Sequence, residues 1–181
     1  MRKIFLTAGH KGGSSGANAN GFSEACETIN LRNQIANFLK EKGVDVFVDY
    51  DTALLSEVIQ AVNSVCSKDD ICIDIHFNSV SNPNANGTEV LRPFAFTQTE
   101  IDLAESILHV TCDALNTKNR GVKHEGEGHH SRLAMLSNVK CNSIILEVCF
   151  ISNENDVALY LNNKESLASA LADTIFNFAI L

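Results

Sequence analysis

Short apolar runs alternate with amphipathic stretches along most of the chain. Apolar residues at the spacing of one helix face predict helices over 24–42, 51–66, 97–116 and 163–178. Apolar runs, several rich in β-branched residues, predict strands over 3–8, 44–48, 71–75, 88–91, 133–136 and 143–150. Strands and helices alternate through the first half of the chain, which is typical of right-handed crossovers into a parallel sheet. The pattern therefore predicts an α/β fold, with a central, mostly parallel or mixed sheet and helices on both faces.

The predicted strands and the segments between them differ in their expected surroundings. The run over 71–75 is uninterrupted and apolar, which is typical of a central strand covered on both faces. The run over 88–91 is predicted to be an edge strand. The polar, glycine-rich segment 118–132 is predicted to be a surface loop near the functional site. No linker, repeat or low-complexity segment is visible, so residues 1–181 are expected to form a single domain.

Composition and charge argue against several classes of partner. The 181 residues are 45% hydrophobic, which is enough to bury a full-sized core. The formal net charge of −8 argues against nucleic acid and anionic membranes, because both attract positively charged surfaces. No apolar run approaches the roughly 20 residues of a membrane span. The first apolar run is broken at Thr7, too early for the core of a signal peptide, so no signal peptide is expected.

The six cysteines are widely spaced and form no C-x-x-C motif. Cys72 and Cys149 lie inside apolar strand runs, where free cysteine behaves as a small hydrophobic residue. This spacing argues against a zinc knuckle or a disulfide framework, and it favours reduced, mostly structural thiols.

Four polar residues stand out against the apolar pattern. His10 follows the first strand, Glu24 begins the first helix, His76 follows the apolar run over 71–75, and Glu147 interrupts a late apolar run. The carboxyl ends of parallel strands share one edge of a sheet, so these side chains can converge there. Two histidines and one glutamate form a common catalytic zinc set, and a further glutamate can act as the base.

Each of the four also has a structural interpretation. His10 can support a turn, Glu24 can interact with the helix dipole, and His76 can make a hydrogen bond at a strand end. Glu147 is harder to explain structurally, because burying a carboxylate costs on the order of several kcal/mol unless a partner or metal offsets it. Their joint occurrence favours the metal site over the separate structural roles.

Four segments carry a family resemblance: Gly9-His10-Lys11-Gly12, Gly21-Phe22-Ser23-Glu24, His76-Phe77-Asn78 and Leu146-Glu147-Val148-Cys149-Phe150-Ile151-Ser152-Asn153. In this order they resemble the zinc-dependent N-acetylmuramoyl-L-alanine amidases of the third amidase family, which are cell-wall hydrolases of bacteria and phage endolysins. The resemblance extends from residue 3 to about 178. It implies an α/β fold, a Zn²⁺ cofactor held by His10, Glu24 and His76, and Glu147 as the catalytic acid and base.

Glu27 is an alternative to Glu24 as the carboxylate ligand. In the family the glutamate ligand opens a helix that a glycine closes several turns later. Glu24 with Gly43 fits this spacing and Glu27 does not, so Glu24 is the predicted ligand.

The chain departs from the family pattern at two places. Thr7 and Ala8 stand where the family usually has Asp-Pro, and Asp74 stands where it usually has a small residue. By the strand period of two, Asp74 shares a face with His76. Asp74 therefore either orients the imidazole of His76 through a hydrogen bond or caps a neighbouring backbone group.

Three further residues are candidates for substrate binding. Asn78 follows the second histidine and either orients the substrate or closes a turn. Lys123 and Arg132 either pair with carboxylates of a wall stem peptide or are solvated loop charges. The histidines at positions 124, 129 and 130 are rival metal ligands, although exposed loop positions are the favoured interpretation.

The resemblance implies hydrolysis of the amide bond between N-acetylmuramic acid and L-alanine, with peptidoglycan as the partner. Two alternatives are another zinc amidohydrolase or peptidase on the same scaffold, and a catalytically inactive wall-binding module. Residues 1–181 are expected to be the catalytic domain of a monomer, without a separate wall-binding domain. Synthesis in the cytoplasm and action at the cell wall are expected, after phage-lysin-like release or another non-classical exit.

Overall fold

A mixed sheet organises the chain. The computed structural model describes residues 1–10, 14–127 and 132–181. Within these ranges six strands lie in the order β4-β1-β5-β8-β6-β7, and every adjacent pair is parallel except β6 with β8. The strand bounds are Ile4–Ala8 for β1, Val46–Val48 for β4, Ile71–Asn78 for β5, Thr88–Arg92 for β6, Asn119–His124 for β7 and Asn142–Phe150 for β8.

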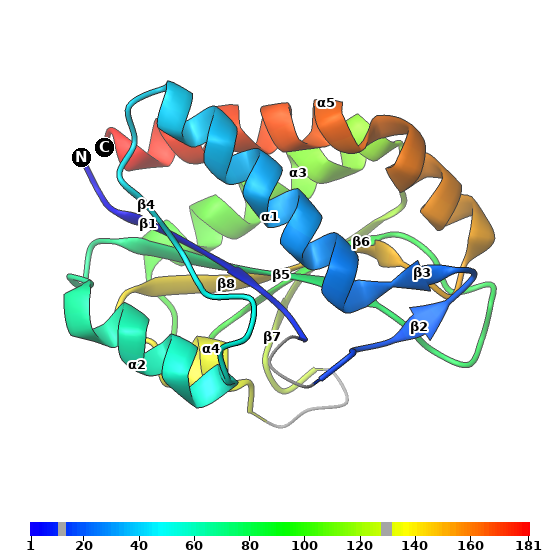
Figure 1. The fold of residues 1–181 in the computed structure, drawn as a ribbon, viewed down its shortest axis with the longest axis horizontal. Helices are drawn as coiled ribbons and strands as arrows, with labels where there is room; N and C mark the ends of the chain where they lie inside the picture. The colour runs from blue at the N-terminus through cyan, green and yellow to red at the C-terminus, as the bar shows by residue number, and fades with distance from the viewer. Residues whose placement is uncertain (11–13, 128–131) are drawn as a thin grey trace.

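Helices cover both faces of the sheet (Figure 1). One face carries α1 (Glu24–Glu41), α3 (Gln98–Leu115) and α5 (Glu154–Ala179), and the other carries α2 (Leu55–Val65) and α4 (Ala134–Ser137). A hairpin of β2 (Asn18–Ala19) and β3 (Phe22–Ser23) leads directly into α1. The predicted α/β fold is therefore confirmed. None of the described helices is both long and apolar enough to cross a membrane.

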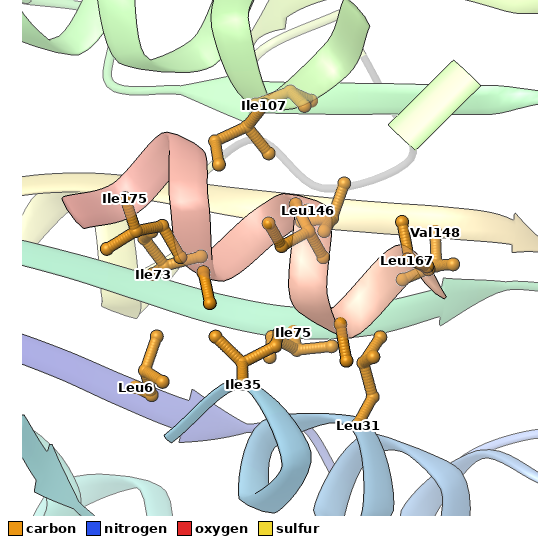
Figure 2. Close-up of a cluster of buried hydrophobic side chains, with 14 of the residues drawn as sticks. Leu6, Leu31, Ile35, Ile73, Ile75, Ile107, Leu146, Val148, Leu167 and Ile175 are labelled. Carbon is orange, nitrogen blue, oxygen red and sulfur yellow. The ribbon is translucent and has the colours of Figure 1, made fainter. Parts of the chain in front are cut away.

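The main core lies between the sheet and the three-helix face. Figure 2 shows Ile73 and Ile75 of β5 beside Leu146 and Val148 of β8, with side chains of α1, α3 and α5 around them. All four of these strand residues are buried. β-Branched and apolar residues on a fully covered strand explain why β5 lies at the centre of the sheet, as predicted.

The opposite face of β5 carries the polar residues. Cys72 packs there with Val58 and Val62 of α2, in a second and smaller apolar cluster. Because successive strand side chains point to opposite faces, Asp74 and His76 share this face with Cys72. The same strand therefore supplies core residues to one side and candidate site residues to the other.

Three expectations for the second half of the chain are wrong. The segment 118–132 contains strand β7, and β6 consequently lies between β7 and β8 instead of at the edge. Each residue of β7 is at least partly exposed, so this strand has no apolar run to reveal it. The predicted strand over 133–136 is instead the single helical turn α4, which is too short to show a helical period.

Two helix starts also differ from their predicted positions. Helix α2 begins at Leu55 rather than at residue 51. Helix α5 begins at Glu154 rather than at residue 163. The side chain of Asn153 caps this start by accepting a hydrogen bond from the backbone N–H of Asp156. The first turn after this cap is polar, so apolar periodicity does not reveal where α5 begins.

The packing of α5 gives a matched test of the core. Leu167 is fully buried whereas Leu161, on the same helix, is 47% exposed. Leu167→Ala should lower the free energy of unfolding by about 2–5 kcal/mol, because it leaves a cavity, and Leu161→Ala by less than about 1 kcal/mol. Urea unfolding of both variants measures the difference. Equal losses would contradict the packing described for this helix.

Candidate active site

Two histidines and a glutamate meet at the carboxyl ends of the central parallel strands. His10 follows β1, His76 lies near the end of β5, and Glu24 is the first residue of α1. The Oε1 atom of Glu24 is 3.6 Å from Nε2 of His10 and 3.3 Å from Nδ1 of His76. One potential ligand atom from each residue lies within 4.8 Å of the other two, a separation at which one metal ion can be shared.

Two glycines make this close approach possible. A β-carbon on Gly9 would overlap the ring of His76, and one on Gly16 would overlap the carboxylate of Glu24 and the side chain of His10. Gly16 also has a φ of +61°, a left-handed conformation that glycine adopts without steric cost. At Gly9 and Gly16 the backbone thus lies in direct contact with the site.

Glu24 is held as a buried, charged carboxylate. Its Oε2 accepts a hydrogen bond from the backbone N–H of Ala17 at 2.9 Å, and its Oε1 accepts one from Phe77 at 3.1 Å. Burial raises the pKa of Glu24, but the hydrogen bonds with His76 and Ala17 outweigh it and leave the pKa below its ordinary value. The side chain therefore presents a fixed negative charge to both histidines.

Glu27, the alternative ligand, points to different partners. Its Oε2 accepts a hydrogen bond from the hydroxyl of Tyr160 at 3.3 Å, and its Oε1 accepts one from Asn30 at 3.2 Å. The group of ligand atoms that can share a metal includes Glu24 and not Glu27.

His76 lies between two carboxylates. Its Nδ1 faces Glu24, and its Nε2 is 3.0 Å from Oδ2 of Asp74. The hydroxyl of Thr7 donates to Oδ1 of Asp74 at 2.6 Å, from the directly paired position on β1. Burial lowers the pKa of His76, but the charge and hydrogen bond of Asp74 outweigh it and raise the pKa well above the usual range. The surroundings therefore favour positive charge at this imidazole.

Glu147 lies beside this cluster on the neighbouring strand, in register with His76. Its Oε2 is buried and has no hydrogen-bond partner among the described residues. Burial raises the pKa of Glu147 to about 7, and the charges of Glu24 and Glu89 act in the same direction against that of His76. A carboxyl group with a pKa near neutrality is suited to accept and return a proton.

A cavity of about 360 Å³ opens onto His10, His76 and Glu147. Its lining combines the polar side chains His10, Asp74, His76 and Glu147 with apolar side chains of α2 and α4, among them Leu55, Val58 and Met135. A concave, largely apolar site with a few convergent polar groups is the usual form of a small-molecule or catalytic site.

Glu89 of β6 is a residue that the sequence interpretation missed. It lies directly opposite Glu147 across the antiparallel β6·β8 pair. Its carboxylate accepts hydrogen bonds from Asn78 at 2.9 Å, from Arg120 at 2.7 Å and from Lys123 at 2.5 Å. Burial raises the pKa of Glu89, but the two cations outweigh it and leave the pKa lowered. A carboxylate inside a predicted strand was the available signal, the same one that singled out Glu147.

The three predicted substrate-binding residues therefore have different surroundings. Asn78 and Lys123 are engaged with Glu89, so a substrate would have to exchange these hydrogen bonds. Arg132 lines a different cavity, of about 1200 Å³, so contact between all three and one substrate stays a prediction.

Of the three candidate histidines in segment 118–132, one lies among the described residues. His124 belongs to β7, and its Nε2 lies 3.0 Å from Oε1 of Glu127. His129 and His130 lie outside the described residues.

The α/β fold thus holds a possible metal site, formed by His10, Glu24 and His76, beside a cavity. The family model described as N-acetylmuramoyl-L-alanine amidase matches residues 4–177, and this chain belongs to that family.

Individual relatives agree with this assignment. The endolysin of Bacillus phage SPP1 is 28% identical over 178 residues, which cover 94% of this chain and 62% of the endolysin. This chain thus spans less than two thirds of that relative. A solved putative N-acetylmuramoyl-L-alanine amidase from Neisseria meningitidis is 28% identical, with a TM-score of 0.79 and coverage of 96% of this chain and 93% of its own.

The amidase AmiC2 of Nostoc punctiforme shares the fold. Its TM-score is 0.83 at 23% identity, over 99% of this chain and 98% of its own.

Proposed function

We propose that this chain hydrolyses the amide bond between N-acetylmuramic acid and L-alanine in peptidoglycan, with zinc held by His10, Glu24 and His76. The observation that carries the proposal is the convergence of these three residues next to a cavity that His10, His76 and the partly buried Glu147 line. Membership of the amidase family supports the choice of substrate. The similarity to a phage endolysin supports action at the cell wall.

The donor set fits zinc. Two imidazoles and one carboxylate suit this metal and leave a fourth coordination position for water or substrate. The negative charges around His76 favour a cation there, whether a proton or a metal ion. When bound, zinc supplies a Lewis acid that lowers the pKa of water from 15.7 towards about 7 and polarises the scissile carbonyl.

Glu147 supplies the proton transfers in this proposal. It accepts a proton from the water that attacks the lactyl carbonyl, and it returns that proton to the amide nitrogen as the C–N bond breaks. The products are the lactyl carboxylate of the glycan and the free amino group of L-alanine. The unpartnered Oε2 of Glu147 and its position opposite His76 support this role.

Asp74 is proposed to orient the imidazole of His76. A carboxylate on one imidazole nitrogen fixes the tautomer and makes the other nitrogen a stronger ligand. Thr7 in turn holds the carboxylate of Asp74 through its hydroxyl. Thr7, Asp74 and His76 thus form one hydrogen-bonded chain that ends at the proposed zinc position.

Replacement of Glu147 tests the catalytic role. Glu147→Gln should lower turnover of purified cell walls by about 10²- to 10⁴-fold, because glutamine cannot transfer the proton. The zinc content of the variant, measured by elemental analysis, should be unchanged. Glu105→Gln, at an exposed position of α3, serves as the matched control. Near-normal turnover by Glu147→Gln would show that another group is the base.

Metal removal and product analysis test the reaction. Chelation should abolish wall lysis and added zinc should restore it, because the proposed Lewis acid is lost and regained. Mass spectrometry should find stem peptides that begin with a free L-alanine, together with unsubstituted muramyl glycan. Release of peptide fragments cut elsewhere would identify a peptidase instead. Wall binding without any lysis in the zinc-loaded protein would identify a binding module.

Replacement of Asp74 tests the orienting role. Asp74→Asn should weaken zinc affinity by about 10- to 100-fold, measured by competition with a chromophoric chelator, because the charge beside His76 is removed. Thr7→Val should have a smaller effect in the same direction. Asp69→Asn, at an exposed turn before β5, is the control. Unchanged zinc affinity and turnover in Asp74→Asn would exclude the orienting role.

A further inference from the structure

A row of cross-strand neighbours leads from the cavity to the last strand of the sheet. Ile145 of β8 pairs with Leu91 of β6, and Leu91 pairs with Lys123 of β7. Ile145 and Leu91 both line the cavity beside Glu147. Because directly paired residues of neighbouring strands point to the same face, Lys123 extends this face beyond the cavity. A ligand that leaves the cavity across Leu91 therefore meets Lys123.

Glu89 holds the ammonium group of Lys123 close to Glu147. The Nζ atom of Lys123 donates to Oε2 of Glu89 at 2.5 Å, and Glu89 is directly paired with Glu147. Neighbouring strands lie about 4.8 Å apart, so the ammonium group lies within roughly 10 Å of Glu147.

Arg120 and Lys123 bring two positive charges to the single carboxylate of Glu89. Arg120 donates from Nε to Glu89 at 2.7 Å and from Nη1 to the carbonyl of Asn86 at 3.2 Å. Its guanidinium also stacks on Phe150, 4.7 Å from the ring centroid. Arg120 is therefore fixed in place and by itself balances the charge of Glu89. The side chain of Lys123 is 26% exposed, so its surplus positive charge can be reached by a ligand.

The stem peptide of peptidoglycan offers a carboxylate at a matching distance. Under the proposed function the scissile carbonyl lies beside Glu147, and L-alanine follows it. The next residue of the stem is a D-glutamate joined through its side chain, so its α-carboxyl group is free unless it is amidated. Consecutive α-carbons of a peptide lie about 3.8 Å apart, which places this carboxylate roughly 7–8 Å from the scissile carbon. This reach is sufficient to bring the carboxylate to the ammonium group of Lys123.

We propose that Lys123, held by Glu89, binds the free α-carboxylate of the second stem-peptide residue, so that the enzyme prefers stems in which this residue is not amidated. The inference rests on the proposed function, because the scissile bond at Glu147 sets the position of the stem. A lysine ammonium has three N–H donors, so it can keep its bond to Glu89 while it donates to the substrate. The substrate carboxylate neutralises the surplus positive charge.

Two synthetic muramyl tripeptides test this subsite. Both carry L-alanine, a side-chain-linked D-glutamate and the same third residue, and they differ only in whether the α-carboxyl group of the glutamate is free or amidated. The zinc-loaded protein should hydrolyse the acid with a kcat/KM about tenfold higher than the amide, because the amide lacks the charge-assisted hydrogen bond. Most of the difference should lie in KM, since the bond forms in the ground state and in the transition state alike.

Variants of Lys123 separate substrate binding from a structural role. Lys123→Met keeps a side chain of similar length and removes its charge. It should bring the ratio of kcat/KM for acid and amide close to one, mainly by raising KM for the acid, whereas Lys123→Arg should retain most of the preference. Lys40→Met, at an exposed position of α1 on the opposite face of the sheet, is the matched control and should retain the full preference.

Binding is measured separately, by calorimetric titration of both tripeptides into the zinc-loaded Glu147→Gln protein. The acid should bind more tightly than the amide, and Lys123→Met in the same background should remove the difference. Equal kcat/KM and equal affinity for the two peptides would overturn the proposal, as would an equal loss on both in Lys123→Met. Tighter binding of the acid without hydrolysis by the unmodified protein would contradict the proposed function and support the subsite.

Discussion

The burial of the Glu24 carboxylate is the constraint on which the rest of the site depends. Removing an ionised carboxylate from water costs on the order of several kcal/mol unless hydrogen bonds and opposite charges replace the lost hydration. Here the backbone N–H groups of Ala17 and Phe77 supply two of those bonds. Because these groups belong to the segment before β2 and to β5, one side chain fastens the first loop, the start of α1 and the central strand together.

Strand alternation then decides which side chains can join Glu24. Ile73 and Ile75 of β5 anchor the core, so Asp74 and His76 must face the cavity side. A register slip of one residue would send His76 into the core and expose its apolar neighbours. The hydrophobic packing of β5 therefore positions the imidazole, and rigid strands hold site geometry better than loops do.

The same physics explains what the sequence alone could predict. His76 and Glu147 were visible because they follow or interrupt apolar runs, and a parallel sheet brings such positions to one edge. Strand β7 and helix α4 were not visible, because one is an exposed edge strand and the other a single turn. The cavity was equally hidden, since part of its apolar lining comes from α2 and α4, which meet only in the folded chain. Glu89 was missed because Arg120 and Lys123, which neutralise its charge, lie on β7, a strand that the sequence pattern predicts to be a loop.

The two departures from the family pattern lie next to each other in the sheet. The resemblance places Asp-Pro where Thr7-Ala8 stand here, and a small residue where Asp74 stands. Thr7 and Asp74 are directly paired across β1 and β5, and the threonine hydroxyl donates to the aspartate. Asp74 thus places a carboxylate at this level of the sheet, on β5. On β5 it lies two residues from His76 and reaches Nε2 directly. A carboxylate at position 7 would add like-charge repulsion to Asp74, whereas the threonine hydroxyl supplies a hydrogen-bond donor to it.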